Sequence, residues 1–425
     1  MDYTFNYRFE PVGQGLFAWG CIHEKDDQAL RFTWVFDCGT TSKQHLVTAA
    51  IDRYERHLGI RKQIDLLTLS HFDGDHISGV AELIRKFRIG TLLLPYTDLK
   101  QRLIYAFEHG VPPNSNLMGF YLNPTDYLAR LEGPGIDRIL IVRSGNGDGP
   151  AMPEGNPEVP DDGDFPPLKF EIDRREDLKE SAGDAVAGQP AGNKKTSVEY
   201  LRRNSKLQLP NLWEFVPYNE DQDEEISQAF ATAVTAAKAP LLAPDSNKRH
   251  EVLLDLLKDV YDKEFGDDSY ERNVISLSLY SGPIYSSWKR VRLRHYLPQK
   301  YNRSVIRARL WHDLPQSGDI DRCSILYTGD AYLDTSNRLN CFINYFLNPR
   351  IEHVGVFQVM HHGAEDNWHK GVAARITPLF SVFSSDPEHK KYKHPHAPVL
   401  RDFWRYGAVQ VDKRTGFCVG GLLIK

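Results

Sequence analysis

The pattern of apolar and polar positions predicts an α/β protein. In the first hundred residues, short apolar runs typical of buried strands alternate with stretches whose apolar residues recur at helical spacing. Strands are predicted at 4–9, 32–36, 64–69 and 91–94, and helices at 42–57 and from about 76 to 87. The pattern returns later, with strands predicted at 274–280, 324–327, 355–359 and 380–383. This alternation is typical of a layered α/β fold.

The middle of the chain has a different character. Residues 144–167 and 181–197 are rich in Gly, Pro, Asp and Ser, a composition that buries little apolar surface and predicts flexible loops. Helices are predicted at 225–237 and after an Asp245-Ser246 cap. We therefore expect one domain over 1–425, with its core in 1–110 and 270–425. Residues 110–270 would form an insertion, partly flexible and partly helical, and a candidate surface for a protein partner.

Composition indicates the class of protein and the compartment in which it folds. The 425 residues are 41% hydrophobic and 26% charged, as in ordinary globular proteins. No apolar run approaches the length of a membrane span, so no membrane contact is expected. The five cysteines are scattered and odd in number, which favours a reducing compartment and predicts a cytoplasmic protein. The net charge of −5 argues against extensive nucleic-acid binding, although a local basic groove remains compatible with it.

The strongest chemical signal is the turn that follows the predicted strand at 64–69. His71, Asp73, Asp75 and His76 place four metal-ligand side chains within six residues, directly before a predicted helix. Asp and neutral His are ligands for zinc, manganese or iron. The alternative is a solvated polar turn in which Asp75 caps the helix, but that explains neither of the two histidines.

Three later clusters also follow predicted strands. They are Thr328-Gly329-Asp330, His361-His362-Gly363 and Lys393-His394-Pro395-His396. Each is weak alone, because Gly-Asp pairs are common in turns and paired histidines are common at surfaces. Their shared position after a strand predicts that they gather with the first motif at one edge of the fold.

Taken together, these motifs resemble the metallo-β-lactamase superfamily. The segment from His71 to His76 is similar to its H-x-H-x-D-H motif, with Asp73 in place of the second histidine. That variant resembles the hydrolase domain of bacterial DNA-uptake competence proteins. Further features of that subgroup occur in the same order along the chain: Val12-Gly13-Gln14-Gly15, Phe36-Asp37-Cys38-Gly39, Thr328-Gly329-Asp330, His361-His362-Gly363 and His394-Pro395-His396.

The resemblance implies an αββα sandwich holding one or two metal ions at the strand ends. Asp330 would bridge two ions. Asp75 and His76 would bind one ion, completed by His394 or His361, while His71 and Asp73 would bind the other. Asp37 would lie under the metal site and orient the ligand side chains. The family's usual third histidine has no counterpart in a motif, and His295 and His312 are the only nearby candidates.

The expected reaction is metal-dependent hydrolysis by an activated hydroxide, with Zn²⁺ or Mn²⁺ as cofactor and two ions per chain. Asp73 makes the site harder and more anionic, which shifts its preference toward manganese without deciding between the two metals. Two-metal chemistry and the subgroup resemblance favour a phosphodiesterase or nuclease acting on DNA. Asp75, His361 and His362 are the candidate catalytic residues, and Lys390, Lys391, Tyr392 and Lys393 could form a phosphate-binding edge.

Two alternatives stay open at this point. The chain could hydrolyse another ester, a lactone, a thioester or a cyclic nucleotide, or it could be a scaffold that binds a partner through its insertion. The intact ligand residues count against the scaffold, and the acidic net charge counts mildly against the nuclease.

Overall fold

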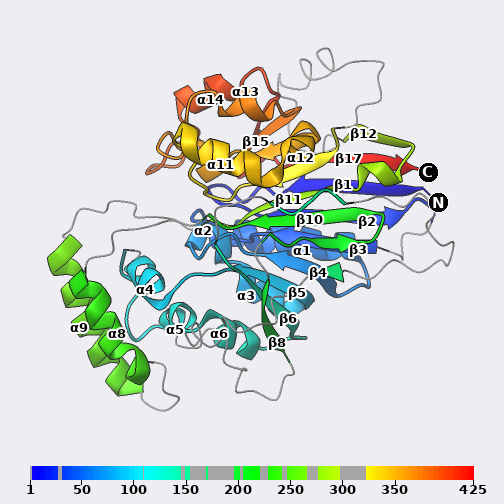
Figure 1. Cartoon of the computed structure of the whole chain (residues 1–425). Helices are drawn as coiled ribbons and strands as arrows, with labels where there is room; N and C mark the ends of the chain where they lie inside the picture. The colour runs from blue at the N-terminus through cyan, green and yellow to red at the C-terminus, as the bar shows by residue number, and fades with distance from the viewer. Residues whose placement is uncertain are drawn as a thin grey trace.

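The computed structural model shows two β-sheets packed face to face with helices on both outer sides (Figure 1). It describes residues 2–26, 31–108, 110–144, 149–153, 169–170, 196–201, 204–220, 228–241, 247–265, 276–296 and 322–425. The predicted αββα sandwich is thereby confirmed. Most of the Gly- and Pro-rich stretches, the Asp245-Ser246 cap and His312 lie outside the described residues.

The first sheet has nine described strands in the order β12-β17-β1-β2-β3-β4-β5-β6-β8. Their bounds are β12 Arg290–Tyr296, β17 Phe417–Ile424, β1 Tyr3–Phe9, β2 Ala18–Glu24, β3 Arg31–Phe36, β4 Gln63–Thr68, β5 Arg88–Pro95, β6 Ile136–Val142 and β8 Ser197–Leu201. Strands β3, β4, β5, β6 and β8 run parallel, so their carboxyl ends meet at one edge.

The second sheet has eight described strands in the order β16-β15-β14-β13-β11-β10-β9-β7. Their bounds are β16 Ala408–Val411, β15 Phe380–Ser384, β14 Val354–Gln358, β13 Ser324–Tyr327, β11 Ser278–Pro283, β10 Trp213–Tyr218, β9 Leu207–Leu209 and β7 Lys169–Phe170. Strands β13 to β16 are parallel, so the segments that follow β13, β14 and β15 also share an edge.

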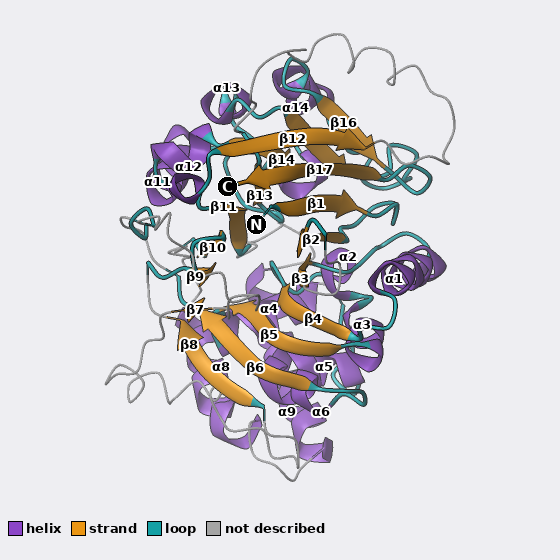
Figure 2. Ribbon diagram, turned by 90° about the vertical axis from the view of Figure 1, so that its right-hand side faces the viewer, coloured by secondary structure: helices purple, strands orange, loops and turns teal. Residues whose placement is uncertain are grey.

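Apolar side chains fill three layers. The middle layer joins the two sheets and includes Trp34, Trp213 and Tyr327, all fully buried. An outer layer lies between the first sheet and helices α1 Gln44–Leu58, α3 Val80–Lys86, α4 Leu99–Glu108, α5 Asn116–Leu122 and α6 Pro124–Arg130. Helices α8 Gln228–Leu241 and α9 Asn247–Phe265 extend this layer by packing on α4. The opposite layer lies under α11 Ser336–Phe346, α12 Asn348–Glu352, α13 Val372–Ile376 and α14 Ala397–Phe403 (Figure 2).

The segment predicted as an insertion contributes to both sheets. Between residues 110 and 270 lie β6 and β8 of the first sheet, β7, β9 and β10 of the second, and the helices α8 and α9. Those two helices match the predicted pair closely. As a domain boundary the insertion stays a prediction, but its described strands extend the sandwich. Within the described residues, no helix combines the length and the apolar character that crossing a bilayer requires.

Candidate metal centre

The metal-ligand candidates meet where the carboxyl ends of the parallel strands of both sheets face each other. The first sheet supplies His71 after β4, followed by the short helix α2 Gly74–Ile77, which carries Asp75 and His76. The second sheet supplies Asp330 after β13 and the paired histidines after β14, in the 3₁₀ turn η2 Met360–Gly363. The sheet topology therefore brings together residues almost 300 positions apart.

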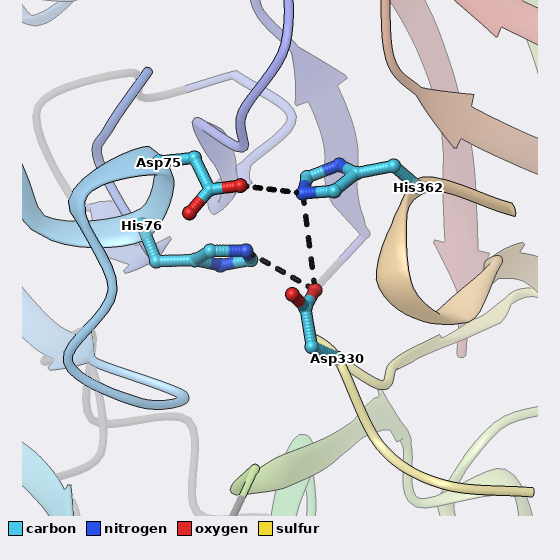
Figure 3. A group of neighbouring side chains, drawn as sticks. All are labelled: Asp75, His76, Asp330 and His362. Atoms are coloured by element: carbon cyan, nitrogen blue, oxygen red, sulfur yellow. Dashed lines mark hydrogen bonds and ion pairs between the residues drawn. The ribbon is translucent and has the colours of Figure 1, made fainter. Parts of the chain in front are cut away.

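Two groups of ligand atoms are close enough to hold cations. Asp75, His76, Asp330 and His362 form one group (Figure 3), and His71, Asp73 and Asp75 form the other. The ligand atoms of each group lie within 4.8 Å of one another. His76, Asp330 and His362 are almost completely buried. A buried cluster of carboxylates and imidazoles requires a compensating positive charge.

Asp330 lies between the two groups and offers one oxygen to each side. Its Oδ1 is 3.1 Å from Nε2 of His76 and 3.9 Å from Nε2 of His362. Its Oδ2 is 3.6 Å from Nε2 of both His71 and His361. This division of oxygens is what a carboxylate that bridges two cations must provide.

The histidines are all oriented through Nδ1. His76 donates from Nδ1 to Oδ2 of Asp37 at 2.8 Å, and His362 donates to the backbone carbonyl of Ser384 at 2.5 Å. Ser70 Oγ donates to Asp37 at 2.6 Å and therefore accepts from Nδ1 of His71 at 2.9 Å. Each of these rings consequently directs the lone pair of Nε2 toward a carboxylate of the cluster.

A lone pair that faces a carboxylate oxygen requires a cation between them. Nε2 of His362 is 3.0 Å from Oδ2 of Asp75, a distance at which either a proton or a metal ion must join the two atoms. Nε2 of His71 is buried and has no hydrogen-bond partner among the described residues. Both observations fit a divalent metal, with nitrogen and oxygen ligands suited to zinc or manganese.

The pKa values of the clustered side chains also favour a cation site. Burial alone would lower the pKa of His76, but the carboxylates of Asp330 and Asp37 raise it well above its ordinary value. Burial would raise the pKa of Asp330, but the surrounding imidazoles, His76 first, hold it well below the usual range. The site thus stabilises positive charge on nitrogen and negative charge on oxygen, as a cation site does.

His361 and His394 lie at the rim of the cluster. Nδ1 of His361 faces Oδ1 of Asn367 at 2.5 Å, and Asn367 in turn donates to the carbonyl of Asp330 at 2.9 Å. The ring of His394 is 5.7 Å from that of His361, and its Nδ1 faces the amide of Gln14 at 3.4 Å. Burial and the neighbouring imidazoles of His362 and His361 lower the pKa of His394 to about 3. His394 is not in either ligand group, and its role as a ligand stays a prediction.

The backbone at the site is unusual at several positions. His361 and His362 both have positive φ, at 43° and 58°, and Asp37 has φ 56°. Such conformations cost about 1–3 kcal/mol each and concentrate at functional sites. Gly329 has φ 53°, and a Cβ there would lie 2.4 Å from Oγ of Ser276, so the turn that presents Asp330 requires glycine.

Several supporting residues could not be assigned from the sequence. Ser384 and Asn367 orient histidines through the contacts above, but neither belongs to a recognisable motif. Tyr121, on α5, donates its hydroxyl to the carbonyl of Phe72 at 2.9 Å and so holds the metal-binding turn from the helical side. Asp37, named from the sequence as an orienting residue, lies fully buried under His76 and also accepts from the backbone N–H of Ser70 at 2.7 Å.

A known family matches the part of the chain that carries the first ligand motif. The family model of the metallo-beta-lactamase superfamily matches residues 31–101, which include β3, β4 and the turn from His71 to His76. The predicted resemblance to this superfamily is confirmed over these residues, whereas the resemblance to competence proteins stays a prediction. Comparison with curated protein sequences gives no significant match.

Two solved structures are similar to the chain. One is a metallo-beta-lactamase fold protein, YhfI from Bacillus subtilis, at 10% identity and a TM-score of 0.36, covering 98% of this chain and all of that one. The other is a long form RNase Z from yeast, at 9% identity and a TM-score of 0.31, covering 89% of this chain and 36% of that one.

Proposed function

Given the superfamily assignment and the cluster around Asp330, we propose that this protein is a metal-dependent phosphodiesterase that acts on nucleic acid, with DNA the first substrate to test. The observation that carries the proposal is the position of Asp330, whose two carboxylate oxygens face two separate sets of ligands. Divalent ions bound by these residues would supply the charge that stabilises the attacking and leaving oxygens of an in-line displacement at phosphorus.

Some residues of the chain would bind the metal ions, and another would bind the substrate or transfer a proton. His71, Asp73, Asp75, His76, Asp330 and His362 would hold Zn²⁺ or Mn²⁺ ions. Of the four histidine side chains that face Asp330, that of His361 is the most exposed, at 13%, against at most 1% for the others. His361 is therefore the one best placed to reach a substrate oxygen, either to bind it or to give the leaving group a proton.

The carboxylate content of the cluster bears on the metal. Three of the six ligands are aspartates, which are harder donors than imidazole and suit manganese better than an all-histidine set does. Elemental analysis of the purified chain would identify the ion, with up to about two ions per chain expected from the two ligand groups.

The proposal is tested by comparing substrates on matched variants. Wild type, His71→Ala and a control, His250→Ala, are incubated with single-stranded DNA, RNA, a small phosphodiester and a lactone, each with Mn²⁺ or Zn²⁺. His250 lies on α9, where its ring contacts the carbonyl of Pro240. Hydrolysis of phosphodiesters by wild type and His250→Ala, but not by His71→Ala, supports the proposal. Turnover of the lactone alone would refute it in favour of another hydrolase.

A further inference from the structure

The loop between β15 and α14 carries a row of rings and cations whose role the metal centre does not explain. We propose that this loop, residues 386–396 and hereafter the strap, binds a single-stranded polynucleotide beside the metal centre. The proposal rests on the phosphodiesterase function proposed above and specifies the form of its substrate. Four observations support it: a continuous row of rings, uncompensated lysines, paired acidic groups and a fixed loop conformation.

The row of rings begins at the metal centre and continues into the strap. The ring centroids of His361 and His394 are 5.7 Å apart, and those of His394 and Tyr392 are 5.8 Å apart at an interplanar angle of 32°. Tyr392 then stacks on His389 at 5.1 Å and 19°. Tyr392 and His389 are half-buried, so their rings are supported on one side and accessible in part. Unpaired bases stack on such rings irrespective of sequence.

The strap also concentrates positive charge. Lys390, Lys391 and Lys393 are exposed, and none of them forms an ion pair with any residue that the structure describes. Nζ of Lys391 lies 4.8 Å from the centroid of the Tyr392 ring and donates to its hydroxyl at 3.2 Å. The ring that would take a base is therefore flanked by a cation that would take the neighbouring phosphate.

The acidic residues of the strap are already compensated. Asp386 accepts from Nζ of Lys413 at 3.0 Å, and Glu388 lies 2.6 Å from the same nitrogen. Arg414 approaches Glu388 at 3.4 Å as well. These pairs neutralise both carboxylates, so the three lysines set the local charge although the whole chain has a net charge of −5. The strap thus carries the local positive charge that an acidic protein needs to bind a nucleic acid.

The strap is held in one conformation before any ligand binds. Gln14 contacts both of its ends, accepting from the backbone N–H of Asp386 at 3.3 Å and reaching Nδ1 of His394 at 3.4 Å. Inside the strap, the N–H of His389 donates to the carbonyl of Asp386 at 2.8 Å. A preformed surface loses less conformational entropy on binding. This gives Gln14, from the Val12-Gly13-Gln14-Gly15 motif, a structural role.

Binding and turnover are measured separately on the full chain. Binding of a fluorescent single-stranded DNA of about twelve nucleotides, a length within the range that such sites cover, is followed by anisotropy with a chelator present to prevent cleavage. Tyr392→Leu should weaken binding about 5- to 100-fold through lost stacking, whereas Tyr392→Phe should bind almost as wild type does. In the metal-loaded enzyme, Tyr392→Leu should raise KM for the oligonucleotide by a larger factor than KM for bis(4-nitrophenyl) phosphate.

The lysines are tested through the salt dependence of the same binding. The double variant Lys390→Gln, Lys391→Gln should reduce the slope of log K against log salt by about 1.4, or about 0.7 for each phosphate contact. The control Lys289→Gln, Arg290→Gln removes two exposed charges at the start of β12, next to the C-terminal end of β17 and away from the metal centre. Its slope should equal that of wild type.

The outcomes distinguish a failure of the proposal for the strap from a failure of the proposed phosphodiesterase function. Unchanged binding by Tyr392→Leu, equal effects of the two double variants, or no binding of single-stranded DNA or RNA by wild type would each overturn the proposal for the strap. Full competition by inorganic phosphate with no effect of Tyr392→Leu would mean an anion site only. If the wild-type protein does not hydrolyse the small diester, the phosphodiesterase function is refuted. The binding assay would still decide the role of the strap.

Discussion

Asp37 offers the sharpest test of how the fold prepares the metal centre. Its carboxylate accepts three hydrogen bonds, from the N–H of Ser70 at 2.7 Å, the hydroxyl of Ser70 at 2.6 Å and Nδ1 of His76 at 2.8 Å. Asp37 belongs to neither group of ligand atoms, so it acts on the metal centre through Ser70 and His76. Asp37→Asn keeps the shape of the side chain but replaces one acceptor oxygen with a donor.

The size of the effect follows from these three contacts. If the new amide faces the N–H of Ser70, two donors oppose each other. If the new amide faces His76 instead, Nδ1 of His76 must accept its hydrogen bond. The ring proton then moves to Nε2, and this nitrogen no longer has a free lone pair to bind a metal. Either arrangement loses at least one hydrogen bond to a charged group, a loss of about 1.5–3 kcal/mol. Metal affinity should fall about 10- to 100-fold, the usual effect of removing such a support.

The measurement is the dissociation constant for Mn²⁺ or Zn²⁺, obtained by competition with a chromophoric chelator. Asp65→Asn is the matched control, because Asp65 lies on β4 of the same sheet and accepts from the N–H of Thr33 at 2.7 Å and from Arg61 at 2.7 Å. Asp65→Asn should lower the stability of the fold without weakening metal binding. Wild-type metal affinity in a correctly folded Asp37→Asn protein would show that Asp37 does not set the orientation of His76.

Three further predictions concern the bridge, the core and pH. Asp330→Ala should abolish hydrolysis and lower metal content while circular dichroism stays that of wild type; retention of metal and activity would exclude Asp330 as the bridge. Arg350→Ala should lower the free energy of unfolding by about 3–5 kcal/mol, measured by urea denaturation, because it leaves the buried Glu214, now 2.9 Å from Arg350, without its partner. Burial raises the pKa of Glu220 to about 7, against about 4.3 in the unfolded chain, so its contribution to stability is present below about pH 4 and is lost as pH rises toward 7. Glu220→Gln should therefore exceed wild type in stability by about 1–3 kcal/mol at pH 8 and by much less at pH 5; an equal difference at both pH values would contradict the assignment.

Much of the sandwich could be predicted because its strands carry strong local signals. The apolar runs at 64–69 and 380–383 are buried on both faces, and the structure contains β4 and β15 there. The role of residues 110–270 was harder to predict. Strand β10 pairs with β11 although 59 residues separate them, and β6 is joined in the sheet to β8 across a long Gly- and Pro-rich stretch. Such pairings depend on contacts between distant segments, which hydrophobic periodicity does not record.

The sequence also could not predict how single side chains of the candidate site are placed. A contiguous motif such as His71 to His76 is visible because one turn carries four ligands, but the sequence leaves open which later histidine faces which ion. The backbone settles this geometry: positive φ at His361 and His362 turns consecutive side chains so that His362 faces Oδ1 of Asp330 and His361 faces Oδ2. A left-handed pair of non-glycine residues has no periodic signature, so this placement could be found only in three dimensions.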